Sequence, residues 1–360
     1  MRLCGGGALG LVVPSGCPVR PWFDVEVPED ALCIKCARQH GPHRCGWQPD
    51  GDDEQMNMPV STPNMGFGIV ILPDQRWSQA ARRWRLAEEY GFAHAWTYDH
   101  LGWRTLVNGP WFDAIPTLTA AAAVTSRIEL GILVASPNFR HPVSFARQLT
   151  SVDDICGGRL VLGLGAGAGG TSFDTTVLGI APLTTGQRAA RFAEFAELLD
   201  LILRTDRVTW HGEYYTAVDA RNLPGCARSP RIPFVVGGQY ARSVEVAARL
   251  GDGWVTIGTK SDDLDKWWDS VTEGIHRLRD AVGAAGRDPA AVPKYLQLDA
   301  APVFSLSSAA YFADAVGRAS QLGFTEVITH WPRPDGPYAG DEAVLETVVA
   351  DLVSRAEGHG

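Results

Sequence analysis

Residues 151–162 read SVDDICGGRLVL, and this stretch contains the pattern that decides the fold. A helical run ends at a glycine that suits a left-handed helix cap, and a short apolar strand follows directly. Three other stretches repeat the same order, which predicts regular alternation of helices and strands. They are AEEYGFAHAW at 87–96, AARLGDGWV at 247–255 and SQLGFTEV at 320–327.

Eight short runs of nearly continuous apolar residues follow Met65, and helical periodicity lies between and after them. Parallel strands that are covered by helices on both faces show this pattern. We expect strands at 67–72, 94–98, 128–134, 159–164, 232–236, 253–257, 294–300 and 325–330. We expect helices at 77–90, 111–125, 142–155, 186–204, 240–250, 261–282, 308–322 and 342–355.

This alternation predicts the α/β class and, within it, a closed (β/α)8 barrel over residues 65–360. Such barrels typically have about 250 residues plus insertions. An open doubly wound sheet is the alternative, but it needs a glycine-rich phosphate turn after the first strand, where the chain has Leu72-Pro73-Asp74. Residues 1–64 lack apolar periodicity, so we expect a poorly structured N-terminal extension or an artefact of start-site choice.

Composition and charge exclude several kinds of partner. The chain has 32 basic and 41 acidic residues and a pI near 5.5, so it has no basic surface for nucleic acid or anionic lipid. No segment approaches the roughly 18 consecutive apolar residues of a membrane-spanning helix, and the N-terminus lacks a convincing secretory segment. We expect a cytoplasmic protein that acts on a small molecule.

The cysteines raise the question of a metal, because five of the seven lie in the first 45 residues. Thiol and imidazole groups there are spaced closely enough to close a tetrahedral zinc site. The many prolines and glycines and the cramped spacing of the last ligands argue against one. We expect no metal and keep zinc as the alternative, with the ligands Cys33, Cys36, His40, His43 and Cys45.

Active sites of closed barrels lie where the strands end. The second strand is followed by Tyr98-Asp99-His100, with Trp103 three residues later. A histidine here can exchange protons near neutral pH, and an adjacent carboxylate such as Asp99 can fix its tautomer. The alternative is a purely structural histidine, which caps a helix or packs in the core. Ala135 and Ser136 come at the end of the third strand and directly after it, where small residues before a proline favour close approach to a flat ring and a cis peptide.

Glycines follow the next strands. Gly165 and Gly167 lie in GLGAGAGG after the fourth strand and predict a floor or lid for a bulky ligand, or else a flexible linker. After the fifth strand, a glycine turn precedes a helix whose first amides can hold a cofactor phosphate. A short turn after the sixth strand could enclose the other side of this phosphate, although both turns could be purely structural. The residues of these two turns are Gly237, Gly238, Gln239, Gly258 and Thr259.

Aromatic residues suggest the character of the cavity. Loops 101–112, 166–185 and 206–231 are expected to roof it, and they supply Trp111, Phe173, Trp210 and Tyr214. We therefore expect an apolar or aromatic substrate. His330 and Trp331 follow the last strand and predict a rigid aromatic wall.

The chain from Met65 to about Arg355 resembles the bacterial luciferase-like superfamily of flavin- and deazaflavin-dependent oxidoreductases. The order and spacing of several short motifs together carry the resemblance. They are YDHL at 98–101, SP at 136–137 with RHP at 140–142, GGRL at 157–160 with GLGAG at 163–167, and VGG at 236–238 with GDGW at 251–254.

The resemblance implies a non-prolyl cis peptide around Ala135-Ser136 against the cofactor ring, and a phosphate near Gly237 and Gly238. It implies that His100 is the acid/base and that a tryptophan, here Trp103, encloses the ring. Asp174 stands where some relatives have a glutamate. A homodimer is also implied.

Three functions remain open. The first is hydride transfer with the deazaflavin coenzyme F420, in which His100 handles the proton. The second is an FMN-dependent monooxygenase that uses oxygen and a separate flavin reductase. The third is a barrel that binds a flavin or deazaflavin without catalysis.

Overall fold

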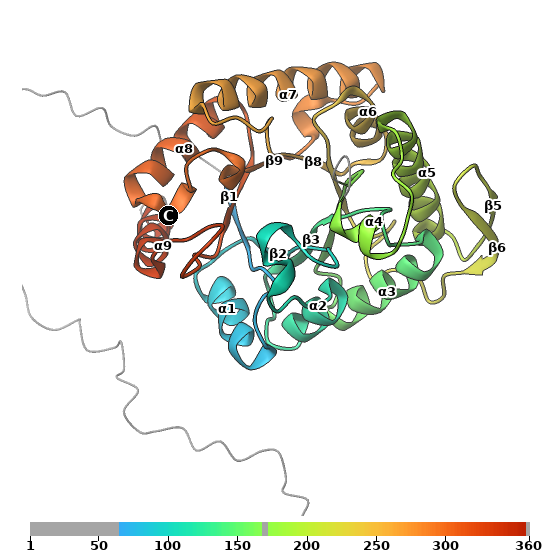
Figure 1. Cartoon of the computed structure of the whole chain (residues 1–360), viewed down its shortest axis with the longest axis horizontal. Helices are drawn as coiled ribbons and strands as arrows, with labels where there is room; N and C mark the ends of the chain where they lie inside the picture. The colour runs from blue at the N-terminus through green and yellow to red at the C-terminus, as the bar shows by residue number, and fades with distance from the viewer. Residues whose placement is uncertain (1–64, 168–171, 358–360) are drawn as a thin grey trace, which may run out of the picture. The chain divides into compact units, whose positions relative to one another are not determined.

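The computed structural model describes residues 65–167 and 172–357, with side chains as far as residue 352. Eight parallel strands form a closed barrel in the order β1-β10-β9-β8-β7-β4-β3-β2 (Figure 1). The closed barrel confirms the predicted fold class. Its strands are β1 Gly66–Val70, β2 His94–Thr97, β3 Glu129–Ala135, β4 Leu160–Leu164, β7 Phe234–Gly237, β8 Gly253–Thr256, β9 Lys294–Gln297 and β10 Glu326–His330.

Helices surround the barrel as an outer ring in Figure 1. The eight predicted helices are present within a few residues of their expected bounds, and a ninth, short helix, α4 (Phe173–Val177), lies among the described residues as well. The eight are α1 Trp77–Glu89, α2 Ala114–Ala122, α3 Pro142–Ile155, α5 Thr185–Arg204, α6 Ala241–Leu250, α7 Leu264–Ala284, α8 Ala309–Gln321 and α9 Glu342–Glu357. Short 3₁₀ helices occupy η1 Arg104–Asn108, η2 Pro289–Ala291, η3 Leu298–Ala300 and η4 Ser305–Ser307.

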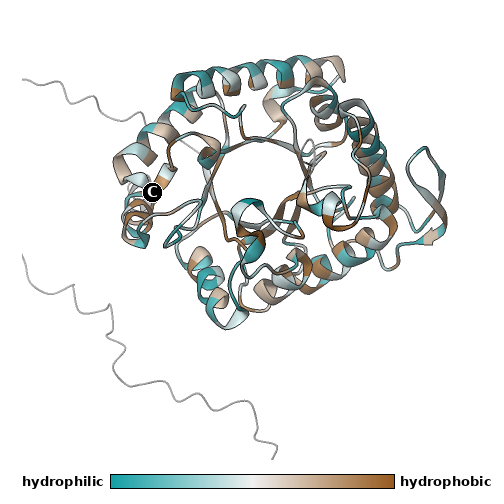
Figure 2. Ribbon diagram, viewed as in Figure 1, coloured by the Kyte–Doolittle hydropathy of each residue, from teal (hydrophilic) through white to brown (hydrophobic). Residues whose placement is uncertain are grey.

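The core lies between the barrel wall and the helices, and Figure 2 shows hydrophobic residues concentrated on the strands. The amphipathic face of α5 illustrates the packing, because Phe192, Phe195 and Leu199 recur at helical spacing and are all inaccessible. Burial of such apolar area stabilises a fold by roughly 25 cal/mol per Å². The helices are therefore held to the barrel chiefly by these faces.

The glycines between helices and strands behave in two ways. Gly91, Gly157 and Gly323 have positive φ values of 81°, 64° and 84°, as expected for left-handed caps. The prediction is wrong at Gly251, whose φ is −74°. A Cβ atom at Gly251 would lie 2.6 Å from the carbonyl oxygen of Ala247, so this glycine permits close backbone approach instead.

Segment 206–231 differs from the expected roof loop. It contains an antiparallel hairpin, β5 (Arg207–His211) and β6 (Thr216–Arg221), which lies outside the helical ring beside α5 in Figure 1. Trp210 and Tyr214 both bind Glu194 of α5 there. They do not line the cavity described below, because the hairpin packs on the outer surface of the barrel.

The position predicted for the cis peptide is also wrong. The non-prolyl cis bond joins Leu133 and Val134, two residues before Ala135-Ser136. The strand continues to Ala135, and the register of β3 with β4 shifts between Ile132 and Ala135. The irregularity therefore lies inside the strand and not at its end.

Candidate functional site

A cavity of about 1330 Å³ opens where the strands of the barrel end. Its walls come from the ends of β2, β3, β4, β7, β8 and β9, together with η1, α4 and the beginnings of α5 and α6. Pockets for one drug-sized ligand measure roughly 300–1,000 Å³. The volume is therefore sufficient for a cofactor and a small substrate together.

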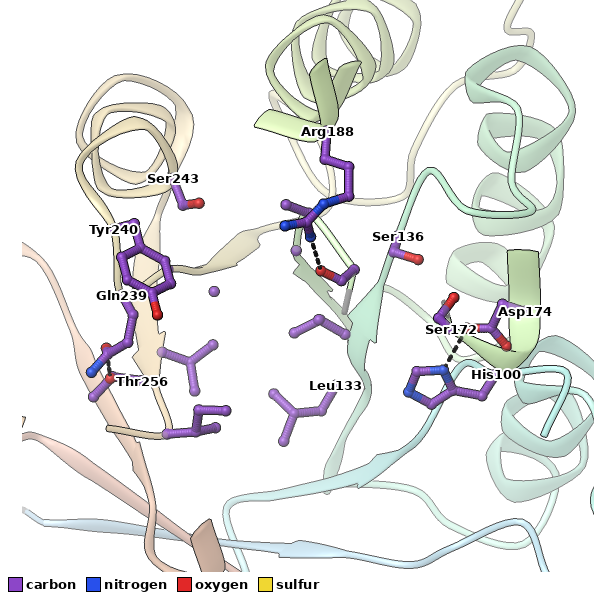
Figure 3. Close-up of a pocket in the computed structure, with 18 of the residues that line it drawn as sticks. His100, Leu133, Ser136, Ser172, Asp174, Arg188, Gln239, Tyr240, Ser243 and Thr256 are labelled. Carbon is purple, nitrogen blue, oxygen red and sulfur yellow. Dashed lines mark hydrogen bonds and ion pairs between the residues drawn. The ribbon is translucent and has the colours of Figure 1, made fainter. Parts of the chain in front are cut away.

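Most of the residues predicted for the site line this cavity. Two do not, Asp99 and Ala135, which are both buried. Figure 3 shows His100, Ser172 and Asp174 on one side, and Gln239, Tyr240 and Ser243 on the other. The predicted residues that line the cavity are His100, Trp103, Ser136, Gly165, Gly167, Gly237, Gly238, Gln239, Gly258 and Thr259.

His100 is held by a carboxylate from α4. Its Nδ1 atom lies 2.8 Å from Oδ2 of Asp174, and the other oxygen of Asp174 accepts the amide of Leu101 at 2.8 Å. The Asp174 side chain is 2% exposed and that of His100 is 24% exposed. Asp174 therefore fixes the ring while the other ring nitrogen, Nε2, is directed into the cavity (Figure 3).

Asp99 has a different partner from the one expected. Its two oxygens accept Nη2 and Nε of Arg140 at 2.6 and 3.1 Å. Arg140 also binds Asp113, the N-terminal cap of α2. Asp99 thus ties the loop after β3 to the loop after β2, and the carboxylate that orients His100 is Asp174.

Sequence reasoning missed a buried polar chain next to the cavity. Nδ1 of His330 lies 2.7 Å from Oδ2 of Asp299, Tyr98 lies 2.8 Å from Nε2 of His330, and Nε2 of Gln297 lies 2.7 Å from the Tyr98 hydroxyl. Burial lowers the pKa of His330 and raises that of Tyr98 well above its usual value. Both groups are therefore neutral at pH 7, so Tyr98 donates to His330 and accepts from Gln297.

The aromatic wall is built largely from residues near this chain. Trp103 stacks on Trp111 and Tyr338, with ring centroids 6.3 and 5.9 Å apart, and Tyr338 stacks on His330 at 3.5 Å. His330 thus belongs to the wall as predicted. Trp331 does not, because its indole binds Glu342 at the start of α9. The available signal for the missed residues was that Tyr98, Gln297 and His330 all stand at strand ends.

The glycine turns form the opposite wall. The Gly238 amide donates to the carbonyl of Val255, so it is not free to bind a phosphate. A Cβ atom at Gly238 would lie 2.6 Å from Cβ of Ser243, which shows that this glycine allows α6 to pack against the turn. Ala241 and Arg242 are the first residues of α6, so their backbone amides have no hydrogen-bond partner within the helix. These two amides are better placed to hold an anion than the amide of Gly238.

Two unsatisfied polar atoms support a ligand in this cavity. Nε2 of Gln239 and Nε of Arg188 are buried and have no hydrogen-bond partner among the described residues. Both residues line the cavity. A buried donor without a partner is costly, and phosphate or ring carbonyl oxygens of a flavin-type cofactor would satisfy such donors. The residues present therefore fit a cofactor of this class.

The described residues contain no group of three or more His, Cys, Asp or Glu residues that could hold a metal ion. The residues of the zinc alternative lie outside the described part of the chain. Within residues 65–167 and 172–357, no helix is both long and apolar enough to cross a membrane.

Residues 58–302 match the family described as luciferase-like monooxygenase. The chain belongs to the luciferase-like monooxygenase family. This match confirms the resemblance drawn from the sequence motifs. The cavity and the polar side chains at the strand ends are therefore those of a luciferase-like oxidoreductase.

Individual relatives of this luciferase-like oxidoreductase are distant. An uncharacterised protein of Mycobacterium tuberculosis is 28% identical over 305 residues, which cover 80% of this chain and 99% of that protein. An F420-dependent glucose-6-phosphate dehydrogenase of Nakamurella multipartita is 33% identical over 231 residues, or 63% of this chain and 65% of that protein. The solved coenzyme F420-dependent tetrahydromethanopterin reductase of Methanopyrus kandleri has a TM-score of 0.64 at 20% identity, with coverage of 79% and 97% respectively. That structure confirms the barrel fold.

Proposed function

We propose that this luciferase-like oxidoreductase uses the deazaflavin coenzyme F420 to transfer a hydride to or from a carbon of a small organic substrate. The observation that carries the proposal is the pairing of His100 with Asp174 at the wall of the large cavity. A histidine whose Nδ1 is held by a carboxylate presents Nε2 to the ligand, where it can take or give a proton.

In this proposal the chain supplies binding and proton transfer. An alcohol substrate would lose its hydroxyl proton to Nε2 of His100 as its carbon loses a hydride, and the reverse would hold for a carbonyl substrate. Ser136 and Gly165, at the ends of β3 and β4, would lie against the cofactor ring. Gln239 and the first turn of α6 would hold its phosphate. F420 would supply the hydride acceptor or donor when bound.

Two features favour F420 over FMN. Two of the relatives described above carry names that specify F420. The cavity wall also contains the cations Arg188, Arg242 and Lys260, and F420 has a longer anionic tail than FMN. An FMN-dependent monooxygenase with a separate reductase is the second candidate, since the family description specifies monooxygenases.

The experiment that tests the proposal is a binding titration of the purified full chain with F420 and, separately, with FMN, each oxidised and reduced. The proposal expects F420 to bind at least about tenfold more tightly than FMN in one redox state. Tighter binding of reduced FMN would favour the monooxygenase. Saturable binding of neither cofactor would overturn both. Binding without turnover of any alcohol or carbonyl substrate in a broad panel would favour the non-catalytic barrel.

A homodimer, a cytoplasmic location and an apolar or aromatic substrate stay predictions. For the substrate, the apolar side chains of Trp103, Phe173 and Val107 provide support, because all three line the cavity together with His100. Apolar walls with few polar groups are typical of pockets for small organic molecules.

A further inference from the structure

Arg104 lies at the end of the cavity that contains His100. It begins η1 and lines the cavity. The carbon at the centre of its guanidinium group, Cζ, lies 4.4 Å from the centre of the Trp103 ring. Trp103 contacts Tyr98 edge-on at 5.1 Å, and the Tyr98 ring lies 6.2 Å from that of His100. These contacts connect the cation with the proposed proton-transfer residue through two rings.

The guanidinium of Arg104 has unused hydrogen-bond donors. Three arginines line the cavity, and two of them bind backbone carbonyls: Arg188 binds Gly167 at 3.2 Å and Arg242 binds Gly186 at 3.3 Å. Arg104 is exposed, and its guanidinium makes no hydrogen bond or ion pair with any residue in the described part of the chain. A guanidinium offers five N–H donors in a planar fork that matches a carboxylate or a phosphate.

The backbone around this cation is unusual. Arg104 has a φ of 48°, and Tyr338, which stacks on the same tryptophan, has a φ of 63°. Among the described residues, only one other non-glycine residue has a positive φ, Asp219 in the outer hairpin. This region is disfavoured for residues with a Cβ atom. Residues that are held in it tend to cluster at ligand sites, and here two flank Trp103.

The charge of Arg104 also acts on the interior of the cavity. Burial raises the pKa of Tyr98 and of Tyr338, and the positive charge of Arg104 opposes that rise in both. An anion that binds there would meet a cation with no competing carboxylate among the residues that the structure describes. The ring contacts described above place this cation near His100, whereas Gln239 and Tyr240 of the proposed phosphate wall lie across the cavity from His100 (Figure 3).

We propose that Arg104 binds an anionic group of the substrate, a carboxylate or a phosphate, while the reacting carbon lies beside His100. This inference rests on the proposed function, because it places the substrate in the same cavity. The neighbouring wall of Trp103, Val107 and Phe173 accommodates an apolar or aromatic body. The substrate class is thus an apolar or aromatic alcohol or carbonyl compound with one anionic group.

The test is a calorimetric titration of the full chain, saturated with whichever cofactor the binding titration identifies, or without cofactor if neither binds. The probes are benzoate and phenyl phosphate, with benzyl alcohol as the neutral comparison. We expect saturable binding of at least one anion and weaker binding of the alcohol. Arg104→Met should weaken anion binding about tenfold or more, because a charge-assisted hydrogen bond is lost.

Two variants serve as controls. Arg85→Met removes an exposed arginine of α1 on the outer surface and should leave anion binding unchanged. Arg104→Lys keeps the charge without the planar fork and should bind the anion with intermediate affinity. Equal melting temperatures would show that Arg104→Met is folded.

Two results would overturn the inference. One is no saturable binding of either anion to the wild-type chain up to about 10 mM. The other is equal anion affinity in wild type and Arg104→Met, whether or not that variant loses cofactor affinity. Failure of the proposed function would appear separately, as absence of F420 binding in the cofactor titration. The two failures are therefore distinguishable.

Discussion

The carboxylate of Asp174 lies 2.8 Å from Nδ1 of His100, although 74 residues separate them in the chain. Asp174 stands in the first turn of α4 with its side chain almost inaccessible, and it also accepts the amide of Leu101. One carboxylate therefore fixes both the imidazole ring and the loop that presents it. This arrangement requires the Nδ1 proton to face Asp174, so that Nε2 faces the ligand.

Replacing Asp174 should impair catalysis more than cofactor binding. In Asp174→Asn the amide group of the new side chain can donate to Nδ1, which would favour the wrong tautomer of His100. We expect turnover to fall roughly 10²–10⁴-fold, with cofactor affinity within about threefold of wild type. Steady-state rates and cofactor titrations of the same samples measure both.

The double variant is the control for this prediction. His100→Ala should cause a similar loss, and His100→Ala with Asp174→Asn should be little worse than His100→Ala alone, because the two residues act as a unit. Additive losses would show that Asp174 acts independently of the histidine.

The buried hydroxyl of Tyr98 should contribute to stability. Tyr98→Phe leaves Nε2 of His330 and Nε2 of Gln297 without their bonds to it. We expect the free energy of unfolding to fall by about 1–3 kcal/mol, the usual cost of unsatisfied buried polar groups. Tyr295→Phe is a matched control, since its hydroxyl makes no hydrogen bond within the described residues, and it should change stability by less than about 0.5 kcal/mol. Chemical denaturation measures the free energy of unfolding of both variants. Equal losses in Tyr98→Phe and Tyr295→Phe would argue against a stabilising role for the hydrogen bonds of Tyr98.

The carboxylate of Glu88 should stabilise the fold in a pH-dependent manner. Burial raises its pKa, but the amides of Ile128, Arg127 and Ser126 outweigh burial and lower it to about 2 from 4.5. A group whose pKa is lower in the folded state stabilises the fold above its unfolded pKa, and the effect is lost as the pH falls through the folded pKa.

We therefore expect Glu88→Gln to lower the free energy of unfolding by about 1 kcal/mol at pH 7, since solvent weakens this partly exposed interaction. The difference from wild type should shrink between pH 4.5 and 2, the two values that bracket the shift. Denaturant titrations across this pH range measure the difference in the free energy of unfolding. The exposed neighbour provides a control, Glu89→Gln, which should show no such trend. A difference independent of pH would refute the charge as its source.

Gly238 should tolerate no side chain. A Cβ atom there would lie 2.6 Å from Cβ and 3.0 Å from the backbone carbonyl carbon of Ser243, and that backbone belongs to α6. Gly238→Ala should therefore lower the free energy of unfolding by about 1–3 kcal/mol. Gly283→Ala in α7 meets nothing within 4 Å and should be neutral or stabilising by up to about 1 kcal/mol. Thermal unfolding tests the pair, and a harmless Gly238→Ala would contradict the packing described here.

Much of the barrel could be predicted because buried parallel strands are apolar throughout. The residues of β4 and β7, LVLGL and FVVG, contain no polar side chain on either face, so their place in the chain was clear. The hairpin of β5 and β6 was missed because its residues are largely exposed and show no such run. Strand β9 ended at Gln297 and not at residue 300, since the chain turns into a 3₁₀ helix there.

The site was less predictable, because it depends on contacts between distant residues. The position of His100 followed from its place after the second strand, but the assignment of Asp99 as its partner rested on sequence adjacency alone. The long-range bond to Asp174 requires the geometry of α4, which is only five residues long. The hydrogen-bonded series from Asp299 through His330 to Tyr98 and Gln297 joins the ends of three strands, β2, β9 and β10, which are well separated in sequence and carried no shared motif.

The proposed function places F420 in the cavity between His100 and the first turn of α6. A crystal structure of the full chain soaked with F420 tests it most directly. We expect density for the deazaflavin ring within hydrogen-bond reach of Nε2 of His100, and phosphate density at the amides of Ala241 and Arg242. Ring density elsewhere on the protein, or a phosphate remote from α6, would contradict the account.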